Sequence, residues 1–331
     1  MNDDPGFFEM LLGDGSSLFK LTAFALVAAG GFAILQAATG QFLPHDTAFL
    51  GMTAQQLCAL RGCRIVHFMI HDRISFGGVL VAIAVMYLWL AEVPLKRGEG
   101  WAWWALAASG GAGFLSFLSY IGYGYLDSWH GAATLVLLPI FLAGLWKTRK
   151  LRGGRASLSV LSGRHRLGRL LLLAATIGMA VGGLTIMTVG ATSVFVPTDL
   201  EFMGITTAEL RAINVRLVPL IAHDRAGFGG ALVSCGVAMF FAVLFGRPSR
   251  SLWQALATAG AFGFVTAIGI HPVIGYISVP HLAPAVMGAA VFLIGLAATS
   301  PASSARRRES SRRSTLGSAP VAASPSAGDA P

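Results

Sequence analysis

The sequence has few charged residues, and this scarcity excludes an ordinary soluble domain. Charged side chains make up 12 % of the chain, about half of the roughly 25 % that is usual in soluble proteins. Hydrophobic residues make up 55 %, more than a water-soluble chain of 331 residues needs for its core. The net charge of +9 does not indicate nucleic acid, because most Lys and Arg stand in short segments between apolar runs. We therefore expect the lipid bilayer as a partner and no nucleic acid.

Two further features are missing. The strict alternation of apolar and polar residues that marks a membrane β-barrel is absent. Three cysteines are too few for a disulfide framework. Because backbone groups cannot stay unpaired in lipid, the apolar runs should form helices.

Apolar runs of about 20 residues, long enough to span a bilayer, recur along most of the chain. They predict an all-α integral membrane protein with about eight transmembrane helices. The runs cover residues 18–40, 65–91, 101–123, 129–147, 169–192, 214–245, 252–273 and 280–299.

Basic residues follow every second apolar run, and this predicts the orientation. The opposite loops are poorer in Lys and Arg. By the positive-inside rule, the basic segments and both termini are cytoplasmic, so we expect a multi-pass protein of the cytoplasmic (inner) membrane. The end of the chain is rich in Ser, Ala, Pro and Arg, which predicts a disordered tail. The expected units are an N-terminal segment (1–17), a first half (18–147), a basic linker (148–168), a second half (169–299) and the tail (300–331).

The second half of the chain repeats the first. An even number of spans in each half predicts two parallel four-helix repeats, related by a pseudo-two-fold axis along the membrane normal. His71 should then superpose on His223, and His130 on His281. The matching segments follow one another in the same order: 44–53 with 197–206, 71–80 with 223–232, and 103–107 with 253–257.

The four histidines that match between the repeats are the main candidates for chemistry. Ionisable groups inside apolar spans are costly and therefore indicate function. Each half supplies one histidine on its second helix and one on its fourth, which suits the axial ligands of a haem iron. We expect His71 to face His130 and His223 to face His281, with haem b as the cofactor. Another metal, a proton pathway and a structural role remain open.

Small residues share the helix faces of these histidines. Gly78 follows His71 by seven residues, and Gly230 follows His223 by seven. A flat macrocycle could lie along such a groove. The same spacing serves close packing of membrane helices at least as well.

Two Asp-Arg pairs follow the histidines, Asp72-Arg73 and Asp224-Arg225. Neighbours in sequence do not face each other on a helix, and an isolated charge in a span is expensive. We expect Asp72 to pair with Arg225 and Asp224 with Arg73, across the pseudo-axis. In the alternative, Arg73 and Arg225 bind the propionates of haem.

Two cysteines, Cys58 and Cys63, lie in the first outer loop, and the second half has no cysteine at the matching positions. A structural disulfide, a redox-active thiol couple and two free thiols all remain open. The third cysteine, Cys235, is expected to be an ordinary packing residue. His271 has no counterpart in the first half, where Ile121 aligns with it.

This layout resembles haem A synthase over roughly residues 18–299. In that family each four-helix half has one haem-ligating histidine on its second helix and one on its fourth. The resemblance implies that His71 and His130 ligate haem in the first half, and His223 and His281 in the second. The first outer loop of the family often carries a cysteine pair, as this chain does.

The sequence departs from that family around the first histidine. The family has a glutamate three residues before it and an arginine directly after it. This chain has Phe68 and Asp72 there, and the arginine comes one position later, at Arg73. The resemblance therefore implies a haem-binding relative and not the hydroxylating enzyme itself.

These observations predict a haem-binding, redox-active membrane protein, an oxidoreductase that exchanges electrons with a quinone or a redox protein. Two other classes stay open. A transporter or channel would have its site between the repeats, lined by the Asp-Arg pairs. A structural or assembly subunit would bind no cofactor and move no substrate.

Overall fold

The computed structural model describes residues 13–117, 124–125, 127–154 and 163–301. Within these residues every regular element is helical. The long helices are α2 (Ser16–Ala38), α5 (Arg64–Leu90), α6 (Gly100–Ser116), α7 (Ser128–Thr148), α8 (Gly163–Ala191), α11 (Leu217–Phe245), α12 (Arg250–Ile274) and α13 (Val279–Ala298). The short helices are α3 (Pro44–Leu50), α4 (Ala54–Cys58), α9 (Pro197–Met203) and α10 (Thr207–Ile213).

Seven of the described helices are long and apolar enough to cross a membrane, which supports a polytopic membrane protein. The remaining long helix, α6, has 17 residues, and the rest of its expected run, 118–123, lies outside the described residues. The count of eight spans therefore stays a prediction. The same holds for the superposition of the two halves. Most of the expected N-terminal segment and tail, and part of the linker, also lie outside the described residues.

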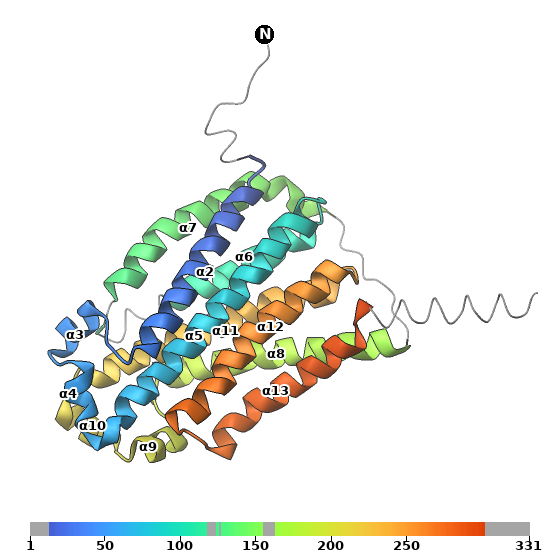
Figure 1. Cartoon of the computed structure of the whole chain (residues 1–331). Helices are drawn as coiled ribbons and strands as arrows, with labels where there is room; N and C mark the ends of the chain where they lie inside the picture. The colour runs from blue at the N-terminus through green and yellow to red at the C-terminus, as the bar shows by residue number, and fades with distance from the viewer. Residues whose placement is uncertain (1–12, 118–123, 126, 155–162, 302–331) are drawn as a thin grey trace, which may run out of the picture.

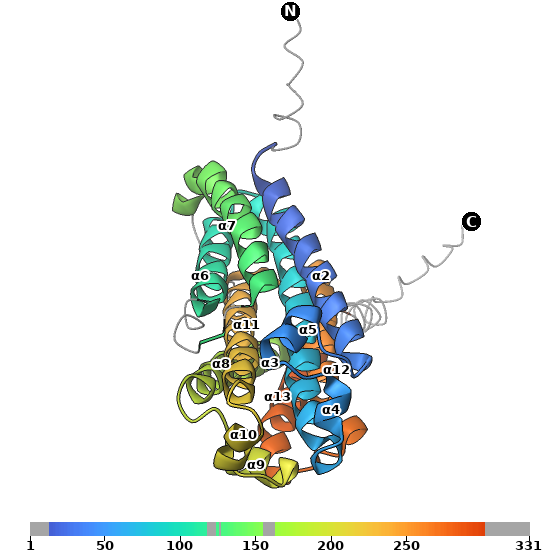
Figure 2. The same ribbon diagram turned by 90° about the vertical axis from the view of Figure 1, so that its left-hand side faces the viewer.

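Helices α5 and α11 form the centre of the bundle. Their apolar spans are 72 % and 61 % buried, whereas the other five candidate spans are 11 to 28 % buried. Figures 1 and 2 show these two helices surrounded by the others, with α7 and α13 on opposite flanks. Helices α2 and α12 pack on α5, and α6 and α8 pack on α11.

The third helices of the two halves are exchanged. Helix α6 belongs to the first half but packs mainly on α11, and α12 of the second half packs on α5. Contact between α5 and α6 is slight. The halves are therefore not two separate four-helix bundles, because each central helix is covered by a helix of the other half.

Glycine pairs allow the remaining close approaches. A Cβ on Gly30 of α2 would lie 2.5 Å from the carbonyl oxygen of Gly77 on α5. A Cβ on Gly183 of α8 would lie 2.6 Å from the carbonyl oxygen of Gly229 on α11. Small residues let membrane helices approach closely, so these pairs fix the first helix of each half on its central helix.

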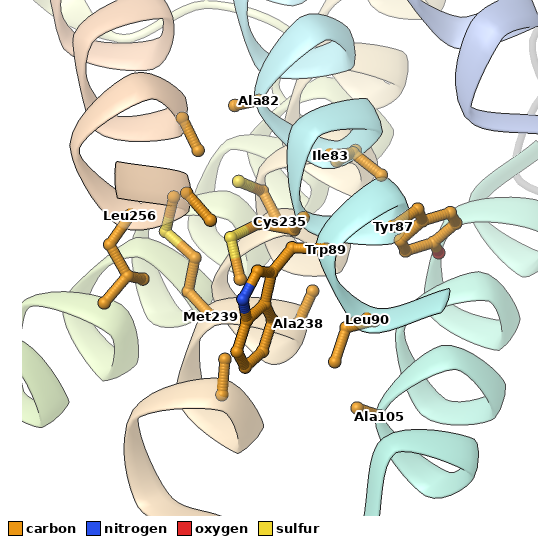
Figure 3. Close-up of a cluster of buried hydrophobic side chains, with 14 of the residues drawn as sticks. Ala82, Ile83, Tyr87, Trp89, Leu90, Ala105, Cys235, Ala238, Met239 and Leu256 are labelled. Atoms are coloured by element: carbon orange, nitrogen blue, oxygen red, sulfur yellow. The ribbon is translucent and has the colours of Figure 1, made fainter. Parts of the chain in front are cut away.

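The core between the central helices is apolar. Figure 3 shows Trp89 and Leu90 of α5 packed with Cys235 and Met239 of α11. Cys235 is fully buried in this cluster, as expected of a packing residue.

The four short helices gather at one end of the bundle, which we call the histidine end (Figure 1). Thr53 and Gln56 cap α4, and Thr206 and Glu209 cap α10, each as a capping box. The first turns of α3 and α9 carry acidic residues at this end of the bundle.

Candidate functional site

The four repeat-matched histidines lie in two clusters at the histidine end. In the His130 cluster, possible ligand atoms of Asp127, His130 and His223 all lie within 4.8 Å of one another. In the His71 cluster, ligand atoms of three histidines lie within the same distance. Its members are His71, His271 and His281.

The predicted pairing of the histidines within each half is wrong. The ring centroid of His71 lies 5.6 Å from that of His281, and the ring centroids of His130 and His223 are 5.1 Å apart. Each pair joins the two halves. The reason is the exchange of the third helices, which brings α12 and α13 to His71 and brings α6 and α7 to His223.

The predicted Asp-Arg pairs across the halves are confirmed. Arg73 Nε lies 2.8 Å from Asp224 Oδ2, and Arg225 Nε lies 3.4 Å from Asp72 Oδ2. All four charges are largely withdrawn from solvent, with side chains 2 to 17 % exposed. Such pairs keep buried charges from standing alone.

Each arginine binds a second carboxylate that the sequence interpretation missed. Arg73 Nη1 lies 2.7 Å from Asp46 Oδ2, and Arg225 Nη1 lies 2.5 Å from Asp199 Oδ2. Asp46 and Asp199 occupy matching positions in segments 44–53 and 197–206. This match between the two halves was the sequence feature that could have identified both carboxylates. With two carboxylates each, the arginines are engaged in ion pairs, and the structure gives no support to the propionate alternative.

Two tyrosines complete the networks. The Tyr125 hydroxyl donates to Asp46 Oδ1 at 2.5 Å, and the Tyr276 hydroxyl donates to Asp199 Oδ1 at 2.8 Å. Burial, together with the neighbouring carboxylate, raises the pKa of both hydroxyls above their ordinary value. Both tyrosines therefore act as hydrogen-bond donors at neutral pH. The resulting chains are Tyr125–Asp46–Arg73–Asp224–His223 and Tyr276–Asp199–Arg225–Asp72–His71.

In each matched histidine an oxygen lies beside Nδ1. A carboxylate oxygen lies 2.9 Å from it in His71, 3.2 Å in His223 and 2.9 Å in His130. In His281, the hydroxyl oxygen of Tyr276 lies 3.1 Å from Nδ1. A carboxylate on Nδ1 fixes the ring and leaves Nε2 as the metal-binding nitrogen, as in most histidine ligands of metals.

Asp127 lies just outside α7 and joins the His130 cluster to His45 of the short helix α3. Its Oδ2 lies 2.9 Å from His130 Nδ1, and its Oδ1 lies 3.2 Å from His45 Nε2. Burial opposes ionisation, but the histidines beside it lower the pKa of Asp127 below its ordinary value. Neither Asp127 nor His45 stood out in the sequence, since neither has a matched histidine or carboxylate in the other half.

A cavity of about 410 Å³ opens beside the His130 cluster, between α2, α5, α6, α7 and α11. Its polar end holds both histidines of that cluster and four carboxylates. The remainder is largely apolar or small. Lining residues include Leu26, Phe76, Leu80, Gly110, Gly113, Leu137, Gly227 and Ser234.

The glycines predicted to form an open groove lie in helix contacts instead. A Cβ on Gly78 would collide with the side chain of Thr266 on α12, and one on Gly230 would collide with Ser116 on α6. The exchanged third helices fill these positions. Beside His223, however, Gly227 and Ser234 on the same helix line the cavity.

Cys58 and Cys63 form a disulfide in the structure. The bridge lies at the histidine end, directly before α5 begins at Arg64. The bond agrees with two of the three alternatives, a structural disulfide and the oxidised form of a redox-active couple, and the choice between these two stays open.

No known protein family, curated protein or solved structure matches the chain. The resemblance to haem A synthase therefore stays an expectation from the order of helices and histidines in the sequence.

Proposed function

We propose that this chain is a polytopic membrane haem protein that transfers electrons, with one haem b held between His130 and His223. The observation that carries the proposal is the cavity of about 410 Å³ at which both imidazoles converge. Iron lies about 2 Å from a ligating imidazole nitrogen, so two axial nitrogens lie roughly 4 Å apart. Possible ligand atoms of Asp127, His130 and His223 all lie within 4.8 Å of one another, a limit that includes this spacing.

The residues around the cavity fit a macrocycle. Cofactor pockets usually enclose about 300 to 1,000 Å³ and are mostly apolar, with a few polar groups. The small residues Gly113, Gly227 and Ser234 line this cavity, whereas the space beside Gly110 is filled by the ring of Phe141. When bound, haem supplies one-electron redox chemistry whose potential the protein tunes.

The protein's own groups prepare the two ligands. Asp224 accepts a hydrogen bond at Nδ1 of His223, and Asp127 Oδ2 lies 2.9 Å from Nδ1 of His130. Carboxylates in these positions orient the rings and make Nε2 more basic. Arg73 compensates Asp224 and Asp46, and we assign it to this role instead of propionate binding.

The basic residues support an orientation with the histidine end outside. The segment Arg149–Gly153 follows α7 at the opposite end of the bundle, and the positive-inside rule places such segments in the cytoplasm. In this proposal, the protein resides in the inner membrane and exchanges electrons with a quinone or a redox protein.

A second candidate is a bare metal ion held by Asp127, His130 and His223. Two histidines and one carboxylate form a common metal-binding set. Three carboxylates, Asp46, Asp127 and Asp224, surround this cluster, and Arg73 is paired with two of them, so a cation would be attracted there.

The two candidates separate on purified full-length protein. Bound haem gives a reduced-minus-oxidised absorption spectrum of the b type, with one haem per chain by pyridine haemochrome assay. We expect His130→Ala and His223→Ala to lose it. His281→Ala, which changes the matched histidine of the other cluster, should retain it. A protein without haem whose metal is lost in His130→Ala and His223→Ala but kept in His281→Ala would favour the second candidate, and a preparation with neither haem nor such a metal would overturn both.

A further inference from the structure

Three imidazoles, one from the first half and two from the second, converge at the histidine end from three different helices. The ring centroid of His271 lies 4.5 Å from that of His71 and 5.2 Å from that of His281. His71 projects from α5, His271 from α12 and His281 from α13. Their ligand atoms lie within 4.8 Å of one another.

His271 is buried without a satisfactory hydrogen bond. It is 3 % exposed, and neither of its ring nitrogens has a hydrogen-bond partner among the described residues. The carbonyls of Ala267 and Ile268, in the preceding turn of α12, approach the ring without a well-directed hydrogen bond. A buried unsatisfied polar group costs about 1–3 kcal/mol and requires an explanation. A ligand bound between the rings would supply one.

The other two imidazoles are already oriented as ligands. Asp72 lies beside Nδ1 of His71 and Tyr276 beside Nδ1 of His281, so each ring can present Nε2 to a metal. Behind them, two carboxylates, Asp72 and Asp199, are paired with one arginine, Arg225. This leaves one negative charge that a cation can compensate.

The third ligand differs between the halves. The first half has Ile121 where the second has His271, and the second half has Ser278 where the first has Asp127. Each cluster thus has two matched histidines and one ligand of its own. The cavity of about 410 Å³ is not lined by any member of the His71 cluster, and Thr266 fills the space beyond Gly78.

We propose that His71, His271 and His281 bind a divalent first-row transition-metal ion directly, without a macrocycle. Imidazole ligands suit zinc, copper, iron and nickel. Three histidine ligands leave one position of a tetrahedral site open for water or a substrate. This site goes beyond the proposed haem and does not depend on it.

The test measures metal on the full-length protein in detergent. The apo protein, prepared with chelator, is titrated with Zn²⁺, and bound zinc is quantified by elemental analysis after gel filtration. We expect one high-affinity Zn²⁺ per chain assigned to this cluster. The variant His271→Ile copies the residue of the first half and should bind that ion at least about tenfold more weakly. His130→Ala is the matched control and should keep it.

A second measurement protects against a folding defect. Co²⁺ bound to the wild-type protein should give the visible absorption of a tetrahedral nitrogen site, and His271→Ile should lose this absorption while it retains its haem spectrum and helix content. Wild-type protein that binds no Zn²⁺ would overturn the proposal, as would unchanged Zn²⁺ affinity in His271→Ile. Wild-type protein that binds Zn²⁺ at this cluster but contains no haem would overturn the proposed function and leave the proposed metal site intact.

Discussion

Arg73 offers the sharpest test of the buried charge networks. Its guanidinium binds two carboxylates, Asp224 at 2.8 Å and Asp46 at 2.7 Å. The side chains of Asp46 and Asp224 are 2 % and 9 % exposed. Replacing Arg73 with Gln would leave both carboxylates in a poorly solvated region without their cation. Removing one partner of a buried pair typically costs about 3–5 kcal/mol.

The chain provides a matched control at the same end of the bundle. Arg61 Nη2 lies 3.2 Å from Glu209 Oε1, but these side chains are 49 % and 51 % exposed. An exposed pair contributes about 0–1 kcal/mol. Arg61→Gln should therefore change the free energy of unfolding by less than about 1 kcal/mol.

The assay is reversible unfolding in mixed detergent micelles, followed by circular dichroism. A double-mutant cycle of Arg73→Gln with Asp224→Asn isolates the pair, because residues in one network show coupling energies of about 0.5–3 kcal/mol. If Arg73→Gln behaves like Arg61→Gln, or if the cycle gives no coupling, Arg73 does not stabilise the protein through these buried ion pairs.

Two further predictions concern the bundle. The disulfide between Cys58 and Cys63 leaves Cys235 as the free thiol, so a thiol assay in SDS should detect one thiol per chain before reduction and three after it; three before reduction would contradict the bridge. Gly30→Ala should destabilise the protein by about 1–3 kcal/mol, because its Cβ would lie 2.5 Å from the Gly77 carbonyl oxygen. Gly31→Ala is the control, because no neighbouring atom lies within 4 Å of a Cβ built at this position. This variant should be neutral or stabilising in the same unfolding assay.

The Asp-Arg pairing could be predicted from the sequence because local geometry restricts it. Asp72 and Arg73 are adjacent and cannot face each other on one helix, and the repeat supplies one candidate partner for each charge. Asp46 and Asp199 were also within reach. Both stand in matched segments, but they lie outside the apolar runs, where an acidic residue is ordinary.

The histidine pairing could not be predicted, because the two third helices look alike in sequence. Both start with the pattern Trp-x-Ala-Leu-Ala, at 103–107 in α6 and at 253–257 in α12. Either helix could pack on α5 by this pattern, and nothing local distinguishes the two choices. The choice decides whether His71 faces its own half or the other. His271 could not be predicted for a related reason: it is present in one half only, so the match between the halves does not indicate it.

The exchange of third helices makes each histidine cluster depend on both halves. In the first half, His130 lies on α7 but its partner His223 projects from α11. In the second, His281 lies on α13 but its partner His71 projects from α5. The ion pairs between Arg73 and Asp224 and between Arg225 and Asp72 cross the same joint, immediately beside these histidines. Asp72 and Asp224 each contact the histidine that precedes them in the sequence and the arginine of the other half. A change in charge at one imidazole therefore acts directly on an ion pair that holds the halves together. Metal or haem binding at either cluster should therefore be coupled to the association of the two halves, which a design with each histidine pair inside one half would not provide.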